Sequence, residues 1–213
     1  PDLEEIVRSV NPERRALAVR KLGELFAQGA AHFNPQHVAL FDGILKGLLS
    51  QADADVRAAL AGQLAALVNA PPLVVRELVF DAEIKVAGPL LRASPLIDEP
   101  TLIEIARMRG QPHLLAISQR VIVPEGVTDV LLRRGERDVV RSVANNAGAL
   151  FSTQGYKTLV QRSADDGMLA VAVGQRDDLP TPLLQQLLSE SADIVRRKLF
   201  QTANPARRAA IAR

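Results

Sequence analysis

Apolar residues recur at intervals of three and four along most of the chain. The clearest examples are Leu17, Val19, Leu22, Leu25 and Phe26, and then Val38, Phe41, Leu45, Leu48 and Leu49. The strict alternation of apolar and polar residues that is typical of a strand is nearly absent, so the pattern predicts an all-α protein. Asn11-Pro12, Asn34-Pro35 and Asn204-Pro205 each place a capping side chain before a proline, which favours a helix start. With further prolines between the periodic segments, we expect about 12 short helices.

A dipeptide that begins with an apolar residue recurs at regular intervals. The pairs are Leu60-Ala61, Val86-Ala87, Ile117-Ser118, Val143-Ala144, Val173-Gly174 and Leu199-Phe200, separated by 26, 31, 26, 30 and 26 residues. The second residue is small in all but the last pair, and small residues let neighbouring helices approach closely. We call the first residue of each pair the anchor and interpret the recurrence as a packing requirement of a structural repeat.

An aliphatic segment follows the anchor in five of these units. The segments are residues 73–78, 101–106, 127–132, 155–160 and 182–188. A single pair of short helices cannot bury its apolar faces, whereas stacked pairs form a continuous core. The sequence therefore predicts a right-handed α-solenoid of HEAT-like helix pairs with a period of about 28 residues, and a non-repeating helical bundle is the alternative.

The predicted solenoid forms a single domain over residues 1–213. Residues 11–50 fit a pair of N-terminal capping helices, residues 55–204 form the repeat array, and residues 205–213 resemble the start of a truncated further helix. Two details depart from the simple pattern. Pro89 follows Gly88 where the other units continue as helix, so we expect a break or kink there. Gly43 and Gly47 have the GxxxG spacing that favours a close helix crossing.

The composition limits the possible chemistry. Hydrophobic residues make up 47% of the 213 residues, which is enough for a sizeable core. Cysteine is absent, so disulfides, thiolate metal sites and a cysteine nucleophile are excluded, and a cytoplasmic location is the expectation. A net charge of +2 does not by itself indicate a nucleic-acid partner, and no apolar run is long enough for a membrane span.

Several phrases of the sequence resemble a known family. The segments 86–106, 112–140, 143–166 and 177–188 are similar to the alphaproteobacterial proteins grouped as domain of unknown function 2336, and the resemblance runs from about Arg14 to about Pro205. It implies a HEAT-like helical repeat fold and a bacterial cytoplasmic setting. It implies no catalytic residues.

The residues that could carry chemistry have simpler structural interpretations. His32 and His37 lie five residues apart, on different faces of a helix, and His113 has no second ligand close in sequence, so we expect no metal site. Asp53, Asp166 and similar acidic residues fall at turns that begin helices, where a carboxylate caps backbone N–H groups. The sequence therefore predicts neither an enzyme nor a cofactor.

Arginine clusters give the only candidate interaction surface. Its residues are Arg120, Arg133, Arg134, Arg137, Arg141, Arg176, Arg196 and Arg197. Arg120 and Arg176 occur in the related stretches ISQRVIVP (117–124) and VGQRDDLP (173–180), where each could cap free carbonyls at a helix end. A solvated face with intrahelical ion pairs is the structural alternative for the rest.

These observations support two hypotheses about function. The first is a non-enzymatic helical-repeat module that binds a protein segment or domain, in regulation or assembly. The alternative is a nucleic-acid-binding helical repeat related to DNA alkylation repeat proteins, which the arginine clusters favour and the scarcity of aromatic residues opposes. Binding of a small molecule between repeats has no residue pattern in its favour.

Overall fold

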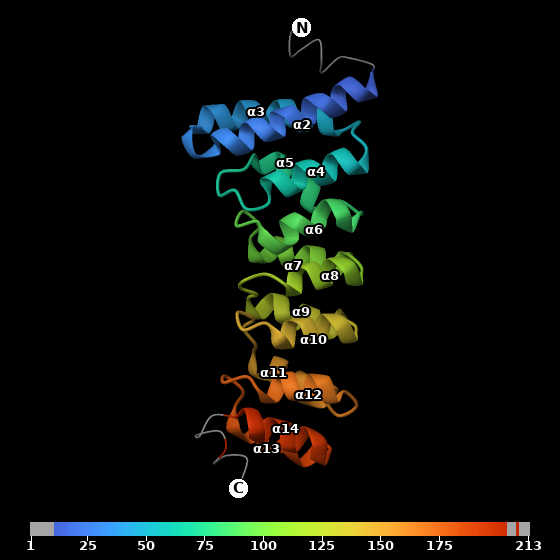
Figure 1. Cartoon of the computed structure of the whole chain (residues 1–213), viewed down its shortest axis with the longest axis vertical. Helices are drawn as coiled ribbons and strands as arrows, with labels where there is room; N and C mark the ends of the chain where they lie inside the picture. Colours follow the sequence, from blue (N-terminus) through green and yellow to red (C-terminus); the bar gives the residue numbers. More distant parts are fainter. Residues whose placement is uncertain (1–10, 204–207, 209–213) are drawn as a thin grey trace. The chain divides into compact units, whose positions relative to one another are not determined.

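The computed structural model of the chain describes residues 11–203 and 208 and contains thirteen α-helices and one 3₁₀ helix there (Figure 1). Their bounds are α2 Pro12–Gly29, η1 Ala30–His32, α3 Pro35–Leu49, α4 Ala54–Leu64, α5 Pro72–Val79, α6 Ile84–Ala93, α7 Glu99–Met108, α8 Gln111–Ser118, α9 Glu125–Arg134, α10 Arg137–Asn145, α11 Thr153–Arg162, α12 Gly167–Gly174, α13 Thr181–Glu190 and α14 Asp193–Thr202. In these residues the extended structure is limited to one isolated bridge between Val123 and Ala149. The all-α prediction is confirmed.

The helices form two compact units, unit 1 over Pro1–Ile105 and unit 2 over Ala106–Arg213. Within unit 1, α2 contacts α4, α4 contacts α6, and α3 contacts α5. Within unit 2, α8, α10, α12 and α14 contact one another in that order, as do α9, α11 and α13. Two sets of helices follow from these contacts. We call α2, α4, α6, α8, α10, α12 and α14 the A helices, and we call α3, α5, α9, α11 and α13 the B helices. Stacked helix pairs, the core of the repeat prediction, are present in each unit. The single domain and its right-handedness stay predictions.

The anchors lie in the A helices and explain the recurring dipeptide. All six anchors are buried, and each A helix from α4 to α14 contains one. A Cβ added to Gly174 would lie 2.6 Å from Cδ1 of Leu199, the next anchor. A Cβ added to Gly23 of α2 would likewise lie 2.7 Å from Cδ1 of the anchor Leu60. A small residue therefore accommodates the following anchor, and the rule extends to α2, outside the predicted array.

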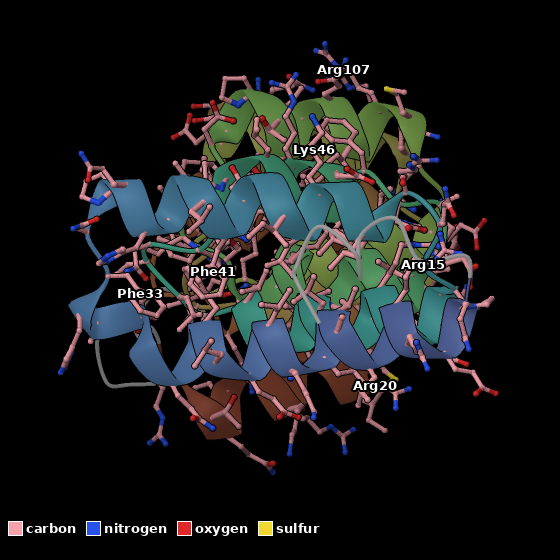
Figure 2. The ribbon with its side chains drawn as sticks, turned by 90° about the horizontal axis from the view of Figure 1, so that it is seen from above. Arg15, Arg20, Phe33, Phe41, Lys46 and Arg107 are labelled. Carbon is pink, nitrogen blue, oxygen red and sulfur yellow. The ribbon has the colours of Figure 1, made fainter. Side chains whose placement is uncertain are left out.

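The N-terminal helix pair, α2 and α3, has an aromatic core of its own. The ring centroids of Phe26, Phe33 and Phe41 lie 5.1–5.4 Å apart. Figure 2 shows Phe33 and Phe41 in the space between these two helices. Three rings pack together in this first pair, whereas the core of the later pairs is mainly aliphatic apart from the Phe151 and Tyr156 rings of unit 2.

Proline and asparagine begin the helices where the sequence predicts it. The Asn11 side chain accepts a hydrogen bond from Glu13 N, and Asn34 forms a capping box with His37, whose Nδ1 accepts from Asn34 N. Residues 204 and 205 lie outside the described residues, as does all of the predicted helix at 205–213 except Arg208. Asp53 and Asp166 also cap helices, since their carboxylates accept from Val56 N and Leu169 N.

The structure differs from the sequence expectations at two positions. Helix α6 continues through Pro89, so the break that we expected as one of two outcomes does not occur, and a kink there stays a prediction. Gly88 carries no Cβ to clash with the proline ring, and the buried side chains on either side hold the helix in place. Gly43 is exposed, and a Cβ added there would have no described atom within 4 Å, so no close crossing occurs at this glycine.

The loops after α8 and α10 lie side by side in unit 2. Val123 N donates to Gly148 O at 3.0 Å, and Leu150 N donates to Val123 O at 2.9 Å. A Cβ on Gly148 would lie 1.8 Å from the backbone oxygen of Val121. Only glycine fits between these two backbones.

Replacing Gly148 should therefore destabilise unit 2. We expect Gly148→Ala to lower the free energy of unfolding by about 2–3 kcal/mol, because the methyl group forces the two loops apart. Urea denaturation followed by circular dichroism measures the change. The matched control is Gly167→Ala, where the added Cβ would lie 3.5 Å from Val195, an ordinary contact. Equal stability of the two variants would contradict the close loop contact.

Candidate functional site

Short helices leave many carbonyl groups without an intrahelical partner, and side chains of the next repeat supply donors to them. Asn146 follows α10, and its Nδ2 donates to the carbonyls of Ser118 and Arg120 at the end of α8, at 2.9 and 2.7 Å. Arg176 follows α12, and its Nη1 donates to the carbonyls of Ala144 and Asn146 at the end of α10, at 3.3 and 2.8 Å. The two residues occupy equivalent positions and make equivalent bonds, one repeat apart.

Arg176 is the centre of a buried polar cluster. Only 9% of the residue is exposed, and its guanidinium forms a two-point pair with the Asp178 carboxylate at 2.9 and 2.7 Å. It also donates to Ala149 O and lies 4.7 Å from the centroid of the Phe151 ring. Carbonyl capping by Arg176 is thus correct, but the carbonyls belong to the preceding repeat.

The groups around Arg176 have shifted pKa values. Burial, helped by the hydrogen bond to Asp178, raises the pKa of Tyr156 to about 12. Burial alone would raise the pKa of Asp178, but hydrogen bonds from Arg176 and Tyr156 hold that pKa below its ordinary value. Arg176 and Asp178 therefore remain a charged pair, and Arg176 joins its own repeat to the preceding one.

The same capping joins α9 to α7 and α11 to α9, and it also occurs in unit 1. Arg134 Nη1 donates to Ala106 O in α7 at 2.6 Å, and Arg162 Nη1 donates to Leu132 O in α9 at 2.7 Å. In unit 1, Asn69 donates to Ala30 O after α2. A side chain of another helix also caps the start of α5. The buried carboxylate of Asp42 in α3 accepts hydrogen bonds from Leu73 N and Val74 N at 3.0 and 2.9 Å.

Two more arginines of the predicted surface bind one carboxylate. Arg141 of α10 donates to both oxygens of Asp166, the N-cap of α12, at 2.7–3.1 Å. Arg137 Nε lies 3.5 Å from the same carboxylate. The hydrogen bond from Arg141 lowers the pKa of Asp166, with the capping bond from Leu169 N acting in the same direction. This carboxylate joins α10 to α12.

The remaining predicted residues do not gather around one point. Arg120 is half-buried, and burial lowers its pKa. Arg133 is exposed and contacts its own helix at Asp129 O, and Arg196 pairs with Asp193. Arg197 is exposed on α14. Arg176 is thus buried, and Arg134, Arg137 and Arg141 form hydrogen bonds or ion pairs with neighbouring repeats. Recognition of a partner by the eight arginines stays a prediction.

A groove along the A helices of unit 2 is the candidate site, and sequence reasoning missed it. One hollow, of about 700 Å³, is lined by Arg141, Asn145, Asp165, Asp166, Gly167, Met168, Val171, Ala172, Gln175, Ile194, Val195 and Lys198. A second, of about 410 Å³, is lined by Ala144, Asn145, Ala147, Ala172, Gln175, Arg176, Asp177 and Asp178. Asn145, Ala172 and Gln175 line both hollows, which therefore adjoin one another at α10 and α12. We call the two hollows together the A groove.

The A groove is apolar at one end and polar at the other. Met168 of α12 and Ile194 of α14 line the larger hollow and are 69% and 77% exposed. Lys198 lines the same hollow. The smaller hollow carries the acidic side chains of Asp177 and Asp178. Met168 and Ile194 each lie five residues before an anchor, and this equivalence in sequence is the signal that could have revealed the groove, although Met and Ile also fit a buried core.

In the part of the chain that the structure describes, no group of three or more His, Asp or Glu residues could hold a metal ion. His113 is buried near the start of α8, and His37 caps α3. No helix among the described residues is long and apolar enough to cross a membrane.

Comparison with known proteins assigns the chain to a family. The family of uncharacterised proteins conserved in bacteria, DUF2336, matches residues 86–213. The chain belongs to this family. The DUF2336 match contains all of unit 2 and begins at Val86, an anchor of α6.

The other comparisons add little. No curated protein matches the chain. A solved structure described as "a leucine-rich repeat variant with a novel repetitive protein structural motif" is 20% identical, and the match covers 97% of this chain and 87% of that one with a TM-score of 0.46.

Removing the Arg176 guanidinium should destabilise unit 2 severely. We expect Arg176→Met to lower the free energy of unfolding by at least about 3 kcal/mol, because carbonyls and the Asp178 carboxylate lose their donor. Chemical denaturation measures the loss. Arg197→Met, at an exposed position of α14, is the control and should change stability by less than about 0.5 kcal/mol. Similar values for the two variants would contradict the capping role.

The Asp166–Arg141 pair should make stability depend on acid pH. The folded-state pKa of Asp166 lies below its ordinary value, so its stabilisation is complete above that value and is lost as the pH falls through the folded-state pKa. We expect Asp166→Asn, which retains a capping side chain, and Arg141→Gln each to flatten the fall in unfolding free energy between about pH 5 and pH 2. Urea denaturation across this range tests the expectation. Wild-type steepness in both variants would contradict it.

Proposed function

We propose that this DUF2336 chain is a non-enzymatic helical-repeat module that binds a segment or domain of a partner protein in the bacterial cytoplasm. The observation that carries the proposal is the A groove, in which Met168 and Ile194 stand exposed on neighbouring helices. Stacked repeats provide a long surface for such contacts, and each helix adds its own side chains to it.

The exposed apolar side chains support a binding surface. Leaving apolar area in water costs roughly 25 cal/mol for each Å² that a partner could cover. Contiguous apolar hollows with a polar rim are typical of interaction sites, whereas single exposed apolar residues are common anywhere. In the larger hollow Met168 and Ile194 accompany Val171 and Val195, and Lys198 supplies a charge at the rim.

The ionic contacts favour a protein over a nucleic acid. A phosphate-binding surface needs cations that are available to phosphates. Arg176 and Arg134 instead bind carbonyls of neighbouring repeats, and Arg141 binds the carboxylate of Asp166. These guanidinium groups hold the repeats together, which supports the protein-binding hypothesis over the nucleic-acid alternative.

Affinity capture with groove variants tests the proposal. We expect the immobilised full chain to retain at least one protein from a lysate of the source bacterium, and Met168→Ser/Ile194→Ser to reduce its recovery at least tenfold. Both positions are exposed, so the variant should keep its circular dichroism spectrum. Quantitative mass spectrometry measures the recovery.

The matched control is Val121→Ser/Ile122→Ser, which replaces two exposed aliphatic residues of unit 2 outside the A groove. It should retain the partner at the wild-type level. The proposal fails if nothing is enriched, or if the groove variant and the control behave alike. Duplex DNA provides a second check: affinity that falls steeply between 50 and 200 mM salt would support the nucleic-acid alternative.

A further inference from the structure

A row of side-chain amides runs along the C-terminal ends of the A helices in unit 2. Gln119, Asn145, Gln175 and Gln201 are all exposed. Each lies two residues after an anchor, in four consecutive repeats. We call these four residues the amide row. Unit 1 lacks it, since Gly62 and Gly88 occupy the equivalent positions after the anchors Leu60 and Val86.

Capping of the preceding repeat does not account for the row. That task belongs to the following position, where Asn146 and Arg176 donate to the carbonyls of the repeat before. Asn145 Nδ2 donates to Arg141 O within its own helix, and Gln175 Nε2 donates to Thr202 Oγ1 at 3.3 Å. These bonds use one donor of each amide, and a primary amide offers two donors and an acceptor oxygen.

The spacing of the row suits an extended chain. The A helices of unit 2 pack against one another in order, and packed helices lie about 8–10 Å apart. An extended peptide rises about 3.3 Å per residue, so successive amides meet its main chain about every three residues. A side-chain amide can donate to a peptide carbonyl and accept from a peptide N–H, whatever the sequence of the peptide.

The surroundings of the row favour particular side chains. Asn145 and Gln175 line both hollows of the A groove, so a chain that lies along the row passes both. An aliphatic side chain fits against Met168 and Ile194 at the apolar end. Lys198, which lines the same hollow, suits an acidic residue of the bound chain.

We infer that the A groove binds an extended peptide segment of a partner protein and holds its main chain through Asn145 and Gln175, the two amides of the row that line it. The inference rests on the proposed function and specifies its ligand: a linear segment with an aliphatic residue and an acidic residue close together. Side chains select the segment, and the amide row supplies contacts that are independent of sequence.

A peptide selection tests the inference with the full chain. A display library of random linear dodecapeptides is selected against the immobilised protein, and an enriched peptide is labelled for fluorescence anisotropy. We expect Asn145→Ala/Gln175→Ala to raise its Kd at least tenfold. The control Gln185→Ala/Gln186→Ala removes two exposed amides of α13, outside the row, and should leave Kd within twofold. Circular dichroism verifies that both variants are folded.

N-methylation of the peptide distinguishes main-chain from side-chain recognition. Methyl groups at single amide nitrogens should weaken binding at least tenfold at sites about three residues apart. The loss should shrink to less than twofold in Asn145→Ala/Gln175→Ala. If neither N-methylation nor this variant changes Kd, main-chain recognition is wrong although the binding function stands. If no linear peptide is enriched while the chain captures a protein through Met168 and Ile194, the ligand is a folded surface and the inference is overturned.

Discussion

The structure depends on how the ends of short helices are satisfied. A helix leaves about four carbonyls without an intrahelical partner, so helices of eight to ten residues, such as α8 and α10, leave almost half of theirs. Asn146 and Arg176 supply donors to these carbonyls from the next repeat, at the point where the anchors already bring the A helices close together. Packing and capping thus act at the same contact. Arg141, Asp166 and Arg176 of the inter-repeat contacts form part of the lining of the A groove, whereas Met168 and Ile194 are exposed there and take no part in capping.

Much of the fold could be predicted because its cause is periodic. The anchors lie where the intervals place them, since each must be buried at one equivalent point of the stack. Prediction from the sequence was less accurate at single residues, where the surroundings in the folded chain changed the effect of a proline or a glycine. Pro89 is tolerated because Gly88 precedes it within a buried helix, and Gly43 is a surface glycine although it has the spacing of a packing motif.

The candidate site was harder to predict than the fold. The arginines attracted attention because they cluster in sequence, but a cluster does not reveal which guanidinium meets a carbonyl two helices away. Arg176 and Asn146 act alike although their side chains differ, so a comparison of residue types does not detect the equivalence. Met168 and Ile194 resemble core residues in sequence, and only the stack shows that they lie outside it.

The caps also give the array a direction. Asn69, Arg134, Asn146, Arg162 and Arg176 each serve carbonyls that come earlier in the chain. During synthesis a repeat is therefore complete only after the following one has left the ribosome. A break between these repeats strands carbonyls on the earlier piece, whereas the later piece keeps asparagine and arginine side chains that water can solvate. Two contacts run the other way, since Asp42 and Gln111 bind backbone groups of later helices. Losing repeats from the C-terminal side thus strands the carbonyls of five caps, whereas losing them from the N-terminal side strands the groups that these two residues bind.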